Sequence, residues 1–377
     1  MISRTDRSNF AIWWWTIDRW TLFTVIALIA IGLMLACAAS PAVAGAGGFY
    51  YAWKQIAFAL IAAVILGVTS SLSLEAIKIV AAATFFLALI GSGITLVAGE
   101  EILGARRWLD FGWLTLQPSE FLKPGFAVLA AAILADKRPL PLRKELIIFL
   151  IILPAICILM FQPDVGQTGL LLTLWGALLF FTGIPAIWIG ALAGAGAAIG
   201  GLAYLLFPYI QHRMAQFMSS GTPGYQEGLA LKAFQHGGLI GVGPGAGTIK
   251  YKLPYAHSDF IFAVAGEEFG LVLCGLIALL FCVLTVRLLL CSSRTRDHFA
   301  QLAGAGLAIV MAAQAFINMG VAIDMLPAKG MTLPFISYGG SSMISLAYTM
   351  GMLLALTREQ PRAAMLAPEP APVGSLI

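Results

Sequence analysis

Long apolar runs constrain this chain more than any other feature, because a helix that crosses a membrane needs about 17 to 25 mostly apolar residues. Such runs recur along the 377 residues, of which 60% are hydrophobic and only 11% charged. A soluble domain carries about 25% charged residues. The sequence therefore predicts an all-α polytopic membrane protein with about ten transmembrane helices. The expected spans are residues 22–39, 55–69, 77–98, 119–135, 146–161, 168–182, 186–207, 260–290, 299–323 and 341–357.

The orientation follows from basic residues in short loops, because lysine and arginine are retained on the cytoplasmic side. The clearest marker is the loop at 136–145, which carries Lys137, Arg138, Arg143 and Lys144. Placing this loop inside puts both termini in the cytoplasm and the two longest polar connections, 99–118 and 208–258, outside. We expect a cytoplasmic segment at 1–20, one transmembrane domain at 21–357 and a disordered cytoplasmic tail at 358–377. The large extracytoplasmic loop, 208–258, precedes the eighth span.

Charge and cysteine usage exclude several functions. A net charge of +4, spread along the chain, is too small for a nucleic-acid surface, so no nucleic-acid partner is expected. The five cysteines show no C-x-x-C spacing, so neither disulfides nor a zinc site are implied. No repeat of fixed period is present, which weakens a transporter built from inverted halves.

The first outer loop offers charged residues for binding or structure. Arg106 and Arg107 stand beside Trp108, and paired guanidinium groups suit a phosphate headgroup, although ordinary lipid headgroups would satisfy them too. Glu120 and Lys123 follow at i, i+3, on one helix face, and can pair. The pair is either a simple interfacial ion pair or, given the neighbouring arginines, part of a functional site.

The second outer loop is rich in glycine. Six glycines fall within residues 237–247, and tight turns of this kind can present backbone amides to phosphate. The signal is weak alone, because glycine-rich loops are common and no Walker lysine follows. It gains weight from Lys250 and Lys252 directly after it and from Arg213 earlier in the same loop.

Asp259 stands where this loop enters an apolar helix. Carboxylates at membrane depth are functional candidates by default, although Ser258 and Asp259 could merely cap the helix. Glu267 and Glu268 lie deeper, Glu267 by about 12 Å. Because adjacent helical residues point about 100° apart, we expect these glutamates to have separate roles. Asp259 ranks above both, since it can meet an extracytoplasmic substrate.

Five motifs, in this order, resemble the SEDS family of shape, elongation, division and sporulation proteins. They are residues 104–108 (GARRW), 117–120 (QPSE), 162–164 (QPD), 259–262 (DFIF) and 333–342 (LPFISYGGSS). The last motif lies in a proline-broken connection, a candidate for irregular backbone at membrane depth that must be buried in protein or line a cavity. The sequence of residues 331–336 and the three tryptophans at 13–15 are more similar to the division branch of the family than to the elongation branch.

The resemblance implies a peptidoglycan glycosyltransferase that polymerises lipid II at the outer face of the bacterial inner membrane, during septal cell-wall synthesis. It implies a class B penicillin-binding protein transpeptidase and other divisome membrane proteins as partners. Asp259 matches the aspartate that the family treats as catalytic, and Glu120 and Lys123 match its buried ion pair. One position departs: the family usually has an acid where this chain has Tyr255, so a second carboxylate role there loses its support.

The implied chemistry needs one proton acceptor. A sugar hydroxyl of lipid II attacks the anomeric carbon of a glycan on a polyprenyl pyrophosphate, with inversion, and Asp259 acts as general base. The residues expected to stabilise the pyrophosphate, with or without a divalent cation (Mg²⁺ or Mn²⁺), are Arg106, Arg107, Arg213, Lys250 and Lys252. The alternatives are a lipid II flippase and a non-catalytic divisome scaffold. The polar residues gather on one side of the membrane rather than at its midplane, which favours an extracytoplasmic glycosyltransferase over the two alternatives.

Overall fold

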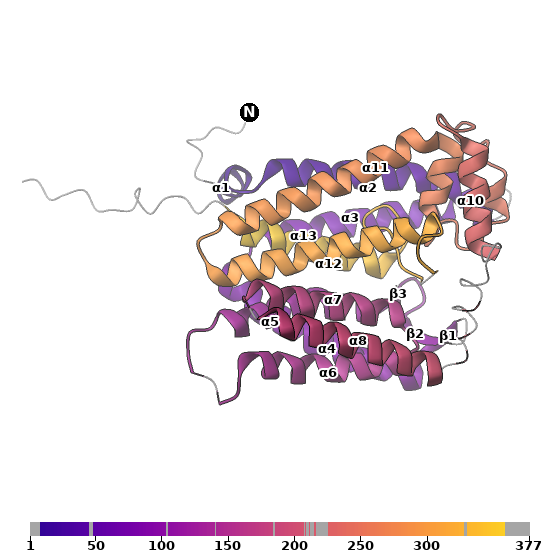
Figure 1. Ribbon diagram of the computed structural model, residues 1–377. Coiled ribbons are helices and arrows are strands. Elements are labelled where there is room, and N and C mark those ends of the chain that lie inside the picture. The colour runs from indigo at the N-terminus through magenta and orange to yellow at the C-terminus, as the bar shows by residue number, and fades with distance from the viewer. Residues whose placement is uncertain are drawn as a thin grey trace, which may run out of the picture.

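The structure, a computed structural model, describes residues 8–44, 48–102, 105–139, 141–183, 185–206, 208, 211, 215, 225–327 and 330–358. Its long helices run side by side as one bundle (Figure 1). The helices are α1 (Asn9–Thr16), α2 (Arg19–Ala44), α3 (Tyr50–Ser70), α4 (Leu74–Ala98), α5 (Ser119–Ala135), α6 (Lys144–Phe161), α7 (Val165–Phe181), α8 (Ala186–Leu206), α10 (Tyr225–Gly237), α11 (Ile261–Arg294), α12 (His298–Ala322) and α13 (Gly340–Leu356).

The mostly helical membrane fold expected from the sequence is confirmed. Each expected apolar run coincides with one of these helices, because backbone in lipid must satisfy its hydrogen bonds within a helix. Among the described residues, six helices are long and apolar enough to cross a membrane: α2, α3, α4, α6, α11 and α12. The helices α7 and α13 are apolar but shorter, with 17 residues each. The number of crossings, about ten, therefore stays a prediction.

Helix α13 is buried along almost its whole length and packs against α3, α5 and α12. Small residues allow the close approach. A side chain at Gly351 of α13 would begin 1.7 Å from the Thr69 hydroxyl of α3, and one at Gly125 of α5 would meet the Phe85 backbone of α4 at 2.9 Å. Small residues at helix interfaces are typical of membrane bundles, where packing rather than hydrophobic burial drives association.

The outward faces of the helices are apolar. On α4, Ile79 and Val97 are 70% and 83% exposed, whereas Phe85 and Ala88 on the opposite face are buried. A soluble protein rarely leaves so large an apolar surface uncovered. The exposed apolar face is the one that contacts lipid, whereas buried polar residues such as Gln314 and Asn318 lie inside the bundle.

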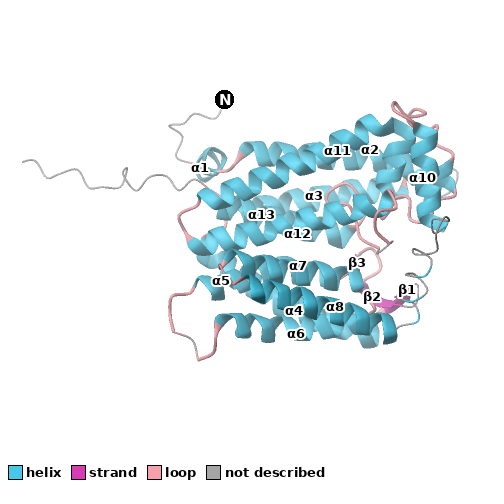
Figure 2. Ribbon diagram, in the orientation of Figure 1, coloured by secondary structure: helices cyan, strands magenta, loops and turns pink. Residues whose placement is uncertain are grey.

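The two ends of the bundle differ. One end carries α1 and the connection between α5 and α6, and the opposite end carries α10 and three short strands (Figures 1 and 2). The strands β1 (Glu100–Ile102), β2 (Ala105–Asp110) and β3 (Thr115–Leu116) form an antiparallel sheet in the order β1-β2-β3. No strand was predicted in the loop 99–118. The strands β1 and β3 have only three and two residues, and the six residues of β2 (ARRWLD) do not alternate between apolar and polar.

Some expected segments are only partly described. The segment 1–20, which was expected to be cytoplasmic, contains α1. The first turn of this helix is capped by the Ser8 hydroxyl, which accepts a hydrogen bond from the Ala11 amide at 3.2 Å. Most of the region 207–224 in the large loop, Arg213 included, and the tail from residue 359 lie outside the described residues.

Candidate active site

Asp259 lies in a series of turns that directly precedes α11, at the end of the bundle that carries α10 and the strands. Its side chain is half-buried. The N-cap residue of α11 is Phe260, which makes no side-chain capping bond. A methyl group placed on Gly330 would lie 3.7 Å from a carboxylate oxygen of Asp259. The carboxylate therefore faces the connection between α12 and α13.

The backbone around Asp259 is held by groups from distant parts of the chain. Three successive carbonyl oxygens accept hydrogen bonds: His257 from the Tyr338 amide (2.9 Å), Ser258 from the Ser337 hydroxyl (2.6 Å) and Asp259 from the Asn318 side-chain amide (2.9 Å). The same Asn318 amide donates to the Met331 carbonyl at 2.6 Å. Helix α12 and the α12–α13 connection together fix the position of the aspartate.

His257 packs next to Asp259 in an aromatic cage. Its ring lies 4.6 Å from the ring of Tyr51 and 5.4 Å from that of Tyr338. Burial lowers the pKa of His257 to about 4, because the apolar surroundings disfavour the charged ring. Its Nδ1 atom is buried and has no hydrogen-bond partner among the residues that the structure describes. A neutral imidazole therefore lies two residues from the aspartate at neutral pH.

Glu267, which sequence reasoning kept as a second candidate, is used inside the protein. It is fully buried, and its carboxylate accepts hydrogen bonds from the amides of Thr248 (2.7 Å), Ile249 (2.7 Å) and Lys250 (2.9 Å). Nδ1 of His236 lies 3.1 Å from the same carboxylate. The amides that directly follow the glycine-rich segment 237–247 are therefore directed at a glutamate of the chain itself.

Glu268 anchors the same loop from the next position. It accepts a hydrogen bond from the Gly245 amide at 3.1 Å and pairs with the ammonium group of Lys250. Lys250 is only 2% exposed and also donates to the Ala38 carbonyl of α2 at 2.8 Å. Both glutamates therefore bind the same loop, although their different directions on the helix predicted separate roles. Lys250, which was expected to contact pyrophosphate, is in this structure a buried counter-ion of Glu268.

Helix α11 is interrupted beside these glutamates, at Gly270, where φ is 75° and ψ is −177°. The backbone groups freed by the break pair with the glycine-rich loop: Val242 and Gly243 donate to the carbonyls of Glu267 and Glu268, and Leu271 and Val272 donate to those of Gly238 and Leu239, at 3.0–3.2 Å. A β-carbon at Gly270 would lie 2.3 Å from the Leu239 carbonyl oxygen. Only glycine fits such a position.

The other basic residues of the expected pool differ in their surroundings. Arg107 is mostly buried and donates to the carbonyls of Gln162 (3.1 Å) and Pro163 (2.7 Å). Its guanidinium therefore ties β2 to the turn between α6 and α7. Arg106 is exposed and pairs with Glu101 at 3.3 Å, and Lys252 is exposed. Neither contacts Asp259 through any bond that the described part of the chain shows.

Glu120 and Lys123 form a buried ion pair, 2.9 Å apart, with side chains 5% and 4% exposed. Lys123 also donates to Gln314 of α12 at 2.8 Å, and Gln167 of α7 donates to Glu120 at 2.5 Å. Gln314 in turn donates to the Thr332 carbonyl at 3.1 Å. The pair therefore joins α5, α7 and α12 to the connection that faces Asp259.

Sequence reasoning missed the two amides of α12, Gln314 and Asn318. Their signal was available, because two polar residues spaced i, i+4 in an apolar run lie on one helix face. Ser337 lies in the 333–342 motif, but its contact with Ser258, like the packing of Tyr51 on His257, follows only from the fold.

The fold and the site together define a polytopic helical membrane protein with a fixed, half-buried aspartate at one end of its bundle. Residues 19–362 match the model of a family of cell cycle proteins that includes FtsW, RodA and SpoVE. The chain belongs to this family, and the resemblance inferred from its motifs is confirmed.

Relatives and solved structures agree with this assignment. The chain is 41% identical over 371 residues to a probable peptidoglycan glycosyltransferase FtsW of Caulobacter vibrioides, covering 96% of this chain and 94% of that protein. It is 32% identical over 365 residues to the Coxiella burnetii protein of the same name, covering 92% and 97%.

Two solved structures share the fold. A chain of a peptidoglycan synthase complex, studied for its coordination of polymerization and crosslinking, aligns with a TM-score of 0.76 and 26% identity over 90% of this chain and 97% of that chain. The rod shape determining protein RodA of Thermus thermophilus aligns with a TM-score of 0.70 and 27% identity, over 92% and 99%.

Proposed function

We propose that this protein is a peptidoglycan glycosyltransferase that polymerises lipid II during division, with Asp259 as its general base. The names of the curated relatives support the reaction. The observation that carries the residue assignment is the contrast among the three carboxylates near the mouth of α11. Glu267 and Glu268 are only 0% and 1% exposed, whereas the side chain of Asp259 is half-buried and lies beside the α12–α13 connection.

In the proposed reaction, Asp259 takes the proton of the attacking sugar hydroxyl as oxygen bonds to the anomeric carbon of the growing glycan. The bond from that carbon to the polyprenyl pyrophosphate breaks, and the configuration inverts. Pyrophosphate leaves as an anion, so no general acid is required. The hydrogen bonds on the carbonyls of residues 257–259 support this role, because a general base must be held within about 3 Å of its proton.

Arg106 and Lys252, two exposed basic residues at the end of the bundle that carries Asp259, are the proposed contacts for the pyrophosphate, together with Arg213. Arg107 and Lys250 act indirectly in this proposal, by holding the β2 strand and the glycine-rich loop. Electrostatic stabilisation of a leaving group requires donors that are in place before the reaction. The contacts of Arg107 and Lys250 hold the loops in position for this purpose.

A divalent cation fits the site only in part. Among the described residues, no three acidic, histidine or cysteine side chains gather closely enough to hold a metal ion. Mg²⁺ is often bound by one or two carboxylates, with water and substrate phosphates completing its coordination. Asp259 is the residue that could contribute here, and the cation would then help to neutralise the pyrophosphate charge.

Partners are proposed on the same basis. One structural neighbour is part of a peptidoglycan synthase complex, and we propose that this chain likewise works with a class B penicillin-binding protein transpeptidase and other divisome membrane proteins. The inner membrane of the division septum is the proposed location, with both termini cytoplasmic and Asp259 on the outer side.

The test is glycan synthesis by the purified protein with its transpeptidase partner, on lipid II in detergent. Asp259→Asn keeps the size of the side chain but removes the proton acceptor, so we expect strand formation to fall by about 10²-fold or more. The matched control is Asp324→Asn, the same substitution at another half-buried residue of the outer end, which should remain active. Normal polymerisation by Asp259→Asn, with unchanged melting temperature, would refute the assignment. Detergent removes any need for transport, so wild-type synthesis there also excludes a purely flippase role.

A further inference from the structure

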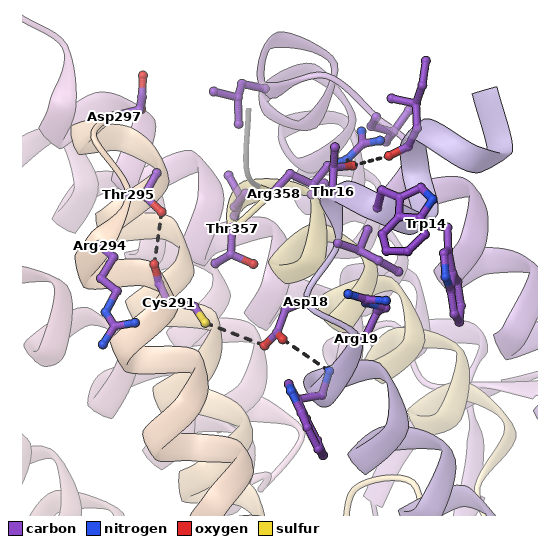
Figure 3. A pocket seen from close by; sticks show the side chains of 18 of the residues that line it. Trp14, Thr16, Asp18, Arg19, Cys291, Arg294, Thr295, Asp297, Thr357 and Arg358 are labelled. Carbon is purple, nitrogen blue, oxygen red and sulfur yellow. Dashed lines mark hydrogen bonds between the residues drawn. The ribbon is translucent and has the colours of Figure 1, made fainter. Parts of the chain in front are cut away.

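A large cavity lies at the end of the bundle opposite to Asp259. It has a volume of about 1730 Å³ and is lined by the α1–α2 turn, the α3–α4 turn and the C-terminal ends of α11 and α13. Figure 3 shows side chains of the α1–α2 turn facing those of α11 across the cavity. Pockets for single small molecules measure about 300 to 1,000 Å³, so this cavity has room for a larger group.

The cavity is lined by more positive than negative charge. Its charged residues are Arg19, Arg287, Arg294, Arg296 and Arg358, against Asp18 and Asp297, which gives 5 − 2 = +3. Every basic member is an arginine, whose planar guanidinium binds phosphate oxygens in pairs.

Both aspartates already have partners. Asp18 accepts two hydrogen bonds of 2.6 Å from Arg287, and Asp297 caps α12 by accepting from the Ala300 amide at 2.9 Å. The other four arginines make no ion pair with a carboxylate in the described part of the chain. Arg358 donates to the Thr16 hydroxyl at 3.3 Å, and Arg19 lies 4.8 Å above the ring of Trp15. Their charge is therefore available to an anion.

Apolar groups line the cavity beside these arginines. Trp14 and Trp15 belong to the wall, and Trp20 and Phe23 of α2 are 70% and 52% exposed. Tryptophan is enriched where a membrane meets water, at the level of the lipid headgroups. A ligand that matches both surfaces has an anionic head and an apolar body.

We propose that this cavity binds the phosphate headgroup of an anionic phospholipid from the inner leaflet, with its acyl chains along Trp20 and Phe23. The leaflet follows from the orientation set by the basic loop at 136–145. Basic pockets between transmembrane helices on the cytoplasmic side are suited to such headgroups. A soluble phosphate or pyrophosphate would satisfy the arginines but leave the aromatic wall uncovered, so a lipid is the source that fits both.

The test measures retained lipid, independently of glycan synthesis. The purified full-length chain is incubated with equal amounts of phosphatidylglycerol and phosphatidylcholine, and bound lipids are counted by native mass spectrometry. We expect preferential retention of phosphatidylglycerol. Arg294→Gln and Arg358→Gln should each weaken it about fivefold, the factor that corresponds to about 1 kcal/mol for one basic residue at an anionic surface. Arg138→Gln, in the exposed loop at the same end, is the matched control and should bind normally.

Two further arms keep the proposal falsifiable. Arg294→Lys keeps the charge and should retain more lipid than Arg294→Gln, which separates binding from a folding defect. Inorganic pyrophosphate should not displace the phospholipid. Equal retention of the two lipids, unchanged retention in both glutamine variants, or complete displacement by pyrophosphate would each overturn the assignment of a lipid site.

Discussion

Removing the charge of Lys123 tests how much of the fold depends on the buried ion pair with Glu120. The variant Lys123→Met keeps the length of the side chain but leaves the Glu120 carboxylate without its counter-ion at a site only about 5% exposed. An uncompensated buried charge costs about 3 to 5 kcal/mol. The loss also removes the donor to Gln314. We expect a clearly lower melting temperature and a lower folded yield in detergent.

The chain supplies a closely matched control. Glu75 and Lys78 have the same residue types, the same i, i+3 spacing and nearly the same separation, 2.8 Å, but their side chains are 78% and 34% exposed. Exposed pairs contribute about 0 to 1 kcal/mol, so Lys78→Met should change the melting temperature little. The double variant Glu120→Gln with Lys123→Met removes both charges and should recover much of the loss. Similar small effects of Lys123→Met and Lys78→Met would refute this reasoning.

Three further predictions concern the end of the bundle that carries Asp259. Gly270→Ala should strongly reduce folded yield, because the new methyl group meets the Leu239 carbonyl at 2.3 Å, whereas Gly275→Ala in the same helix has open space and should fold normally. Burial lowers the pKa of His257 from about 6.5 to about 4, so the unfolded chain binds a proton at this residue more readily than the folded protein. The free energy of unfolding is therefore not reduced by His257 above pH 6.5, and it falls by up to about 3 kcal/mol as the pH is lowered towards 4. His257→Phe should flatten the dependence of melting temperature on pH, and an unchanged slope would contradict it. A cysteine placed at position 245 should react with a membrane-impermeant reagent in intact cells, because we expect this loop to be extracytoplasmic. Labelling only after lysis would show that the orientation is the opposite.

The helices were predictable because one physical rule dominates them. A long apolar run in lipid has to be helical, and the run expected at 119–135 has the same bounds as α5. The break at Gly270 was not predictable. A single glycine in an apolar run gives little signal, and its φ of 75° is set by a loop that begins more than 20 residues earlier.

The contacts of the glycine-rich loop were harder to predict, for a related reason. Helical periodicity correctly separates the directions of Glu267 and Glu268, but it says nothing about the path of a loop that surrounds both. The amides of residues 248–250 meet Glu267, and the Gly245 amide meets Glu268. A glycine-rich segment can be recognised in the sequence as a source of amide donors. The acceptor that binds these donors is known only from the tertiary structure.

The buried ion pair and Asp259 are linked through one helix face. Gln314 accepts a hydrogen bond from Lys123 and donates to Thr332, and Asn318, one turn further along α12, donates to both Met331 and Asp259. Adjacent residues of the α12–α13 connection are therefore held by the two amides. Because the Asn318 side chain donates hydrogen bonds to the carbonyls of both Met331 and Asp259, a shift of the α12–α13 connection displaces the backbone of Asp259.

This linkage separates two effects of the Lys123→Met substitution. If the ion pair served stability alone, the molecules that remain folded would polymerise lipid II at the wild-type rate. Since the pair also positions the connection that faces Asp259, the activity per folded molecule should fall as well. A displacement of about 1 Å at a catalytic group can cost about 10²-fold in rate. The comparison requires activity normalised to the folded fraction, and Asn318→Leu, which leaves the ion pair intact, should show the same loss of specific activity with a smaller loss of stability.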